Sequence, residues 1–179
     1  LEVVRTAARS TRSPLEVYGD RLTAEVLDHS WEGMTLRVRA DREYVLGVPL
    51  RGRHHASNVT LAVRALEILG ICPQSATFSG VRMPGRTERV AQRYVLDVAH
   101  NPQGIQALAD TLRELGLPPG SCILLGLLSD KDSEGSLGPL AVLGLPAVFV
   151  RAGSERAREP GELLGTWTGL GGTGEVAVS

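Results

Sequence analysis

Short stretches of alternating polar and apolar residues fill the first part of the chain and lead into one long apolar run. Over residues 34–39 the two kinds of side chain alternate with a period of two, which indicates a half-buried strand. A turn at residues 40–42 and a second strand at residues 44–48 predict a β-hairpin. Residues 59–69 are nearly all apolar and end at Gly70, which suits a left-handed helix cap, so we expect a buried helix there. A helix end at residues 1–8 and a short strand at residues 15–18 are also predicted.

Residues 72–84 contain proline, serine and glycine with little periodicity, which is typical of a connector between two parts. Beyond them, strand and helix patterns alternate. We predict strands at residues 94–98, 122–127 and 147–150, helices at residues 102–115, 137–143 and 161–167, and a final strand beginning at residue 175. This order favours an α/β fold with a mostly parallel sheet and flanking helices. Because the pattern starts inside a helix and stops inside a strand, we expect the chain to be part of a longer protein.

The composition is that of an ordinary globular protein. The 179 residues are 42% hydrophobic with a formal net charge of −1, so the chain can bury a core. Its 19 basic residues include a single lysine, Lys131, and the arginines are scattered. With aromatic residues at only 4%, neither a phosphate-tracking surface nor a stacking platform for bases is expected. Nucleic acid is therefore not an expected partner.

No apolar run approaches the roughly 20 residues that a membrane helix needs. No basic stretch followed by an apolar one marks an export signal. The two cysteines, Cys72 and Cys122, lie in apolar stretches without the spacing of a metal site or a disulfide framework, so we expect buried free thiols. These features favour a protein of the reducing cytoplasm with no membrane partner.

The segment YVLDVAHNP, residues 94–102, combines a strand that we expect to be buried with the start of a helix. Asp97 stands at the carboxyl end of that strand, where open α/β sheets bind ligands, and the helix beginning near Pro102 offers free N–H groups to an anion. Asp97 is placed to accept hydrogen bonds from a ribose diol, and His100 to touch a base or a phosphate. Alternatively, Asp97 or Asn101 only caps the helix.

Four short motifs follow one another along the chain: GRHHASN at residues 52–58, MPGRTE at residues 83–88, DVAHNP at residues 97–102 and GLLSDKD at residues 126–132. In order and spacing they resemble the folylpolyglutamate and dihydrofolate synthase family, within the Mur ligase superfamily. The third motif is fairly specific to the superfamily, and the fourth favours the folate branch over the ligases that build peptidoglycan. The resemblance implies that residues 1–81 are the C-terminal part of a central ATPase domain. Residues 82–179 would then form most of a Rossmann-like C-terminal domain.

The resemblance also implies roles for individual residues. Asn58 matches the position whose amide meets adenine, Arg86 the arginine that reaches the ATP phosphates, and Asp97 the acid that binds the ribose. His100 matches the histidine of the adjoining loop. A catalytic role is carried over for Arg86 alone, whose planar charged fork can grip phosphate oxygens as charge shifts during phosphoryl transfer. A capping or interhelix bond for Asn58 and a solvated Arg86 are the alternatives.

Three other features are not expected to be functional sites. The family usually has glutamine where His55 stands, so neither it nor His54 is assigned a catalytic role. The pattern GxGxxG at residues 169–174 has no strand before it and no helix after it, and we interpret it as a flexible loop. The acids Asp130, Asp132 and Glu134 lack the later glycine and glutamate of an EF-hand, so they indicate a solvated turn and no metal site.

For a complete member of the family, the resemblance implies that ATP activates a carboxylate of dihydropteroate or of a reduced folyl(poly)glutamate as an acyl phosphate. The amino group of L-glutamate then attacks it, giving an amide, ADP and phosphate. Lys131 lies in SDKDSEG and not at the end of a GxxxxGK[ST] loop, so the phosphate-binding loop and the Mg²⁺ ligands are expected in an N-terminal portion outside this chain. By itself the chain is expected to be inactive, and the ligase to be a monomer. A non-catalytic nucleotide-binding or interaction module is the alternative from a different class.

Overall fold

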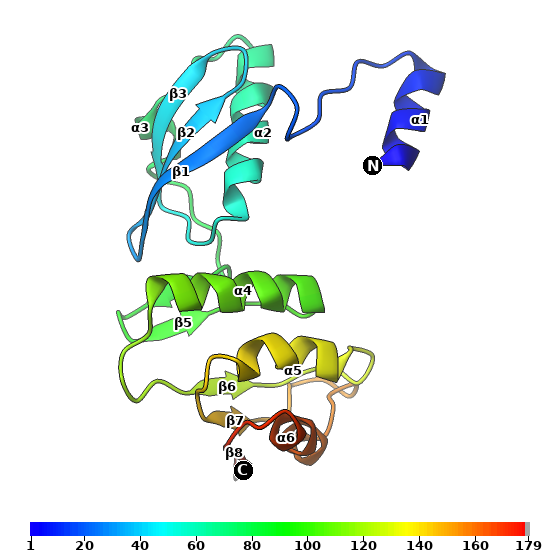
Figure 1. The fold of residues 1–179 in the computed structure, drawn as a ribbon, viewed down its shortest axis with the longest axis vertical. Coiled ribbons are helices and arrows are strands. Elements are labelled where there is room, and N and C mark those ends of the chain that lie inside the picture. Colours follow the sequence, from blue (N-terminus) through cyan, green and yellow to red (C-terminus); the bar gives the residue numbers. More distant parts are fainter. Residues whose placement is uncertain (178–179) are drawn as a thin grey trace. The chain divides into compact units, whose positions relative to one another are not determined.

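A computed structural model describes residues 1–177 of the chain (Figure 1). These residues divide between Arg82 and Met83 into two compact units. The first unit is built on an antiparallel sheet, and the second contains a parallel sheet with helices.

In the first unit, helix α1 (Glu2–Thr11) is followed by strands β1 (Thr23–Ser30), β2 (Gly33–Arg39) and β3 (Glu43–Val48), and then by helices α2 (His55–Ile68) and α3 (Ser75–Phe78). The strands form one antiparallel sheet in the order β1-β2-β3. The predicted hairpin is confirmed, with Leu36 paired to Leu46. Alternation along β2 buries Met34, Leu36 and Val38 on one face of the sheet.

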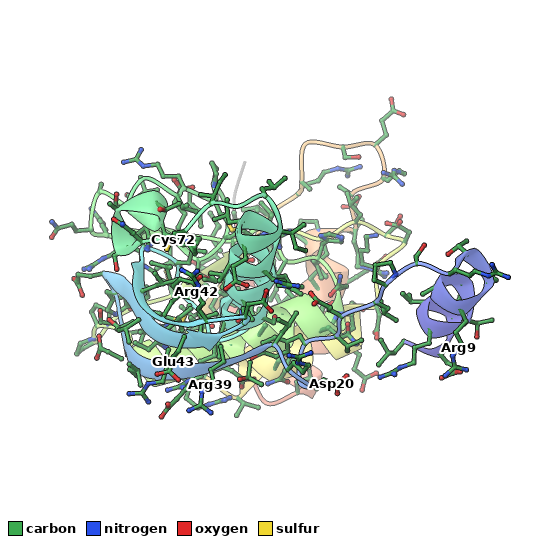
Figure 2. All side chains as sticks on the ribbon, turned by 90° about the horizontal axis from the view of Figure 1, so that it is seen from above. Arg9, Asp20, Arg39, Arg42, Glu43 and Cys72 are labelled. Atoms are coloured by element: carbon green, nitrogen blue, oxygen red, sulfur yellow. The ribbon has the colours of Figure 1, made fainter. Side chains whose placement is uncertain are left out.

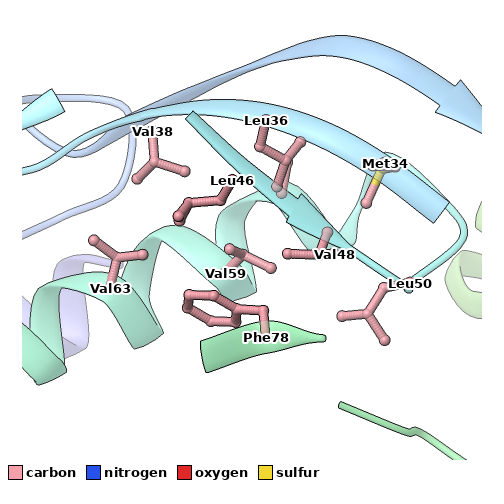
Figure 3. Close-up of a cluster of buried hydrophobic side chains, with 10 residues drawn as sticks. Met34, Leu36, Val38, Leu46, Val48, Leu50, Val59, Val63 and Phe78 are labelled. Atoms are coloured by element: carbon pink, nitrogen blue, oxygen red, sulfur yellow. The ribbon is translucent and has the colours of Figure 1, made fainter. Parts of the chain in front are cut away.

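The buried face of this sheet packs against α2 and α3 (Figure 3). Leu46 and Val48 of β3 join the buried side chains of β2, while Val59 and Val63 come from α2 and Phe78 from α3. Burying a side chain of this size stabilises a fold by about 1.5–3 kcal/mol. Phe78 also shows that the predicted connector is shorter than residues 72–84, because α3 belongs to the first unit.

Other predictions for this unit are wrong in part. Residues 15–18 are not a strand, and only a single bridge joins Tyr18 to Leu22. Strand β1 was not predicted, because polar residues interrupt its alternation and its register shifts between Val26 and Asp28. Helix α2 begins four residues earlier than expected and is buried on one side only. Its other side exposes Leu61, Ile68 and, just past its end, Leu69.

The second unit contains strands β4 (Glu88–Val90) and β5 (Tyr94–Leu96), helix α4 (Pro102–Leu115), strand β6 (Ile123–Leu125), helix α5 (Ser133–Ala141), strand β7 (Ala147–Phe149), helix α6 (Pro160–Gly169) and strand β8 (Gly174–Val176). Strands β6, β7 and β8 form a parallel sheet in that order, which confirms the predicted α/β class. Its core joins Phe149 of β7 to Ile105 of α4, Leu137 of α5 and Trp167 of α6. Of the predicted last strand, residues 178–179 lie outside the described residues.

Strand β5 does not belong to the parallel sheet. It pairs antiparallel with β4 in a separate two-stranded sheet, and its Tyr94 and Leu96 are 54% and 49% exposed, so the expectation of a buried strand is wrong. The hairpin turn has φ of 48° at Ala91 and 54° at Gln92. Such turn positions usually carry glycine or asparagine. Because neither residue occurs here, the sequence did not predict this hairpin.

The GxGxxG segment is a packed turn and not the flexible loop that we expected. The indole N–H of Trp167 donates to the carbonyl oxygen of Thr173 at 2.9 Å. A Cβ added at Gly172 would lie 2.3 Å from the indole nitrogen, and one added at Gly174 would lie 2.3 Å from the carbonyl oxygen of Ala147. Close packing therefore explains these two glycines without any ligand.

Both cysteines are exposed free thiols, so the prediction of buried thiols is wrong. Cys72 follows the end of α2, and Figure 2 labels it together with Arg42. Both residues line a pocket of about 190 Å³. Cys122 directly precedes β6. Among the described residues, no helix combines the length and the apolar character that crossing a membrane requires.

A buried carboxylate ties α2 to the β2–β3 turn. Glu67 accepts hydrogen bonds from the backbone N–H groups of Asp41 and Arg42, both at 3.1 Å, and from the Tyr44 hydroxyl at 2.9 Å. Arg64 contacts the same carboxylate at 3.4 Å. Burial acts to raise the pKa of Glu67, but the hydrogen bonds from Asp41, Tyr44, Arg42 and Arg64 outweigh it, and the pKa lies below its ordinary value.

We expect Glu67→Gln to lower the free energy of unfolding by about 1–3 kcal/mol at neutral pH, because the turn loses its charged acceptor. A folded-state pKa below the unfolded one means that this stabilisation is complete above the unfolded pKa and is lost as pH falls through the folded value. The variant should therefore be less sensitive to acid. Urea unfolding of the 179-residue chain at several pH values tests this, with Glu25→Gln on the exposed face of β1 as the control. Equal losses in the two variants would contradict it.

Candidate functional site

The turn that carries Arg86 is fastened to the end of β5 by hydrogen bonds. The backbone N–H of Val98 donates to the carbonyl oxygen of Gly85 at 2.8 Å. The backbone N–H of Thr87 donates to Oδ2 of Asp97 at 2.7 Å, and the Thr87 hydroxyl donates to the same oxygen at 3.2 Å. The turn and the strand end therefore form one connected piece.

Asp97 is half-buried, and its two carboxylate oxygens have different partners. While Oδ2 serves Thr87, Oδ1 accepts a hydrogen bond from the backbone N–H of Ala99 at 2.7 Å. A carboxylate offers about four lone-pair positions, so it retains capacity for a ligand hydroxyl. Asp97 is not the cap of α4. That role belongs to Asn101, whose Oδ1 accepts from the backbone N–H of Gly104 at 2.8 Å.

The Arg86 side chain is exposed, and within residues 1–177 its guanidinium forms no hydrogen bond or ion pair. Its backbone is held, because the N–H donates to the carbonyl oxygen of Met83 at 3.1 Å. In contrast, Arg64 is paired with Glu16 and Asp41. An exposed guanidinium without an acid beside it is available to phosphate oxygens. The same exposure fits the alternative of a solvated arginine.

His100 lies three residues beyond Asp97 and is exposed. Its Nδ1 is 3.1 Å from the carbonyl oxygen of Val98. Because a carbonyl oxygen can only accept, Nδ1 carries the proton of this hydrogen bond, and Nε2 of the neutral ring is left as an acceptor. The second unit thus brings Arg86, Asp97 and His100 onto one turn and the adjoining strand end.

Asn58 belongs to the first unit, where it lies in the first turn of α2 and is exposed. The cap position of this helix is His54, so Asn58 is not the cap. Its amide has no hydrogen bond within the part of the chain that the structure describes. His54 and His55 have ring centroids 4.1 Å apart, and His55 is buried.

Comparison with known proteins gives three consistent results. Residues 85–169 match the Mur ligase glutamate ligase domain. The dihydrofolate synthase/folylpolyglutamate synthase of Mycobacterium tuberculosis is 36% identical over 121 residues, which are 62% of this chain and 25% of that protein. The structure of Mycobacterium tuberculosis folylpolyglutamate synthase complexed with ADP has a TM-score of 0.87 and 28% identity, covering 98% of this chain and 42% of that one.

In sequence and fold the chain is similar to folylpolyglutamate and dihydrofolate synthases, and its residues 85–169 match a domain of the Mur ligases. A ligase of the wider superfamily is also similar. The UDP-N-acetylmuramoyl-L-alanyl-D-glutamate–2,6-diaminopimelate ligase of Corynebacterium glutamicum is 28% identical over 148 residues, 75% of this chain and 28% of that protein. The chain therefore spans only about a quarter of these curated relatives.

The region that matches the glutamate ligase domain begins at the Arg86 turn and includes Asp97 and His100, whereas Asn58 lies outside it. It also includes the fourth motif of the family, which leads into α5. Asp132 caps this helix, with Oδ1 accepting from the backbone N–H of Gly135 at 2.9 Å. The acid is thus a structural cap. Among the described residues, no group of three or more His, Cys, Asp or Glu side chains is arranged to hold a metal ion.

Two residues that hold this loop and the Arg86 turn were given no role from the sequence. Arg158 donates to the carbonyl oxygens of Ser129 and Lys131, at 2.7 and 3.1 Å, and so holds the fourth motif in place. Thr87 connects Arg86 to Asp97. No local pattern predicts these bonds, because Thr87 contacts a residue ten positions away and Arg158 contacts residues 27 and 29 positions away.

We expect Asn101→Ala to destabilise the chain by about 1 kcal/mol, because α4 loses its side-chain cap. Asn101→Asp keeps an acceptor at the same position and places negative charge at the helix N-terminus, so it should retain most of the stability. Urea unfolding followed by circular dichroism compares the two variants. Equal destabilisation by alanine and aspartate would show that the cap contributes nothing.

Proposed function

We propose that the chain is part of an ATP-dependent ligase that joins L-glutamate to dihydropteroate or to a folyl(poly)glutamate. The observation that carries this proposal is the hydrogen bond from the Arg86 turn to Asp97, inside the region that matches the glutamate ligase domain. It places a fixed carboxylate near Arg86, whose guanidinium forms no ion pair among the described residues. The similarity to folylpolyglutamate synthases and Mur ligases supports the ligase class. A similar protein of known structure was obtained with ADP, which supports a nucleotide as the ligand of this piece.

In this proposal Arg86 contacts the ATP phosphates. Its guanidinium is exposed and has no acid beside it among the described residues. A planar cation that stays charged can hold two phosphate oxygens at once, and its interaction grows as negative charge develops in phosphoryl transfer. Arg86 therefore acts on the transition state more than on ground-state binding.

Asp97 accepts a hydrogen bond from a ribose hydroxyl, using the lone-pair position that Thr87 and Ala99 leave unoccupied. His100 lies beside it and offers Nε2 as an acceptor to the nucleotide. For Asn58 of the first unit we propose contact with the adenine edge, since its amide combines an acceptor with two donors.

We assign residues 1–81 to the C-terminal part of the central ATPase domain and residues 82–179 to the C-terminal domain. The phosphate-binding loop and the ligands of Mg²⁺ belong to the portion of the ligase outside this chain. Lys131 lies in the turn before α5 and not at the end of a glycine-rich loop. The role that we propose for this chain is to supply nucleotide contacts.

The overall reaction gives one amide, ADP and phosphate for each ATP consumed. The carboxylate of the pteroyl or folyl substrate attacks the γ-phosphorus of ATP, and the bond to ADP breaks. The amine of L-glutamate then attacks the acyl carbon, and phosphate leaves with the electron pair of its C–O bond. We propose that the complete ligase works as a monomer in the cytoplasm.

In the complete ligase, we expect Arg86→Ala to reduce kcat by about 100-fold or more with a smaller change in nucleotide affinity, as for other preorganised charges at a transition state. Asp97→Ala should weaken ATP binding by roughly 1–3 kcal/mol, because it removes a hydrogen bond to the ribose. Arg113→Ala, on the exposed side of α4, is the control.

The measurements are steady-state turnover with each pteroyl substrate and nucleotide affinity by calorimetry. Normal turnover in Arg86→Ala together with unchanged ATP affinity in Asp97→Ala would refute the site. Activity with a muramoyl-peptide acceptor in place of the folate would assign the chain to the peptidoglycan branch.

A further inference from the structure

Thr87 has an unusual backbone conformation beside the arginine of the proposed site. Its φ is 44°, in the left-handed region, and its side chain is 1% exposed. A β-branched residue rarely adopts this conformation, because its Cβ substituents crowd the backbone. Such strain persists only where the surrounding structure enforces it, and it is concentrated at functional sites.

Asp97 is the group that enforces this conformation. Its Oδ2 accepts both from the Thr87 N–H at 2.7 Å and from the Thr87 hydroxyl at 3.2 Å. Its Oδ1 is anchored on the N–H of Ala99 at 2.7 Å, so the carboxylate cannot rotate away without breaking a bond on each side. One acid thus holds both hydrogen-bond donors of Thr87.

The other neighbour of Arg86 is fixed as well. Gly85 is left-handed with φ of 66°, its N–H donates to Oε2 of Glu88 at 2.9 Å, and its carbonyl oxygen accepts from Val98 at 2.8 Å. A Cβ at Gly85 would lie 2.8 Å from Cγ1 of Val98, so another residue there would require Val98 to move and would be strained at this φ. The backbone of Arg86 is therefore set on both sides, although its side chain is exposed.

We propose that Thr87 is a positioning residue that, through its bonds to Asp97, sets the direction of Arg86. This inference rests on the proposed function, in which Arg86 reaches the phosphates and Asp97 the ribose. The bonds between Thr87 and Asp97 make these two contacts parts of one rigid piece. A charge that is already aimed when the phosphoryl group moves needs no reorganisation at that moment.

The test compares Thr87→Val and Thr87→Ser in the complete ligase. Valine has nearly the shape of threonine but lacks the hydroxyl, whereas serine keeps it. We expect Thr87→Val to lower kcat by about tenfold with less than about a twofold change in nucleotide affinity, since small misplacement of a catalytic charge mainly affects the chemical step. Thr87→Ser should recover most of that turnover. When Arg86 is already alanine, adding Thr87→Val should cause no further loss.

Independent losses from Thr87→Val and Arg86→Ala, or full turnover in Thr87→Val, would overturn the positioning role. Normal turnover in Arg86→Ala would overturn the proposed function as well as this inference. Full turnover in Thr87→Val while Arg86→Ala is impaired would overturn this inference alone. Should Thr87→Val fold poorly, hydrogen exchange of the 179-residue chain gives a second measurement. Asp97→Asn should then speed exchange at the Thr87 and Ala99 amides and leave the α6 amides unchanged, and unchanged exchange at Thr87 would also overturn the inference.

Discussion

The carboxylate of Asp97 is the interaction on which the candidate site depends. It binds the turn of Arg86 on one oxygen and the start of the following loop on the other. Without this carboxylate, Thr87 would lose the hydrogen bonds that hold its left-handed conformation, and the backbone beside Arg86 would no longer be fixed. The backbone bond from Val98 to Gly85 adds a second tie between the same two segments. The second unit can therefore hold the residues of the proposed nucleotide site in place although β5 itself is short and exposed.

The elements with complete local signals were predicted from the sequence. Helix α4 begins and ends where expected, because Asn101 caps it, Pro102 opens it and Gly116 closes it with φ of 71°. The β4–β5 hairpin was not predicted, because Ala91 and Gln92 occupy left-handed turn positions where glycine or asparagine is usual. Hydropathy predicted buried thiols because both cysteines adjoin apolar runs. They are exposed because Cys72 lies beyond the end of α2 and Cys122 directly before β6.

For the candidate site, the sequence identified residues but not their connections. The order of the motifs predicted Arg86, Asp97 and His100 as site residues. The structure places them in the Arg86 turn and directly after the end of β5. The bond from Thr87 to Asp97 spans ten residues and follows no periodicity, so no local pattern predicts it. Asn58, nominated in the same way, lies on a helix of the first unit, and its role remains a prediction.

Asp97 would have a double role, structural toward the turn and direct toward the ribose. A crystal structure of the complete ligase with ADP tests this most directly. The account predicts a ribose hydroxyl within about 3 Å of an Asp97 carboxylate oxygen, the usual O–H···O distance, with the bond from Thr87 still in place. A ribose bound elsewhere, or a carboxylate that releases Thr87 when the nucleotide binds, would contradict it.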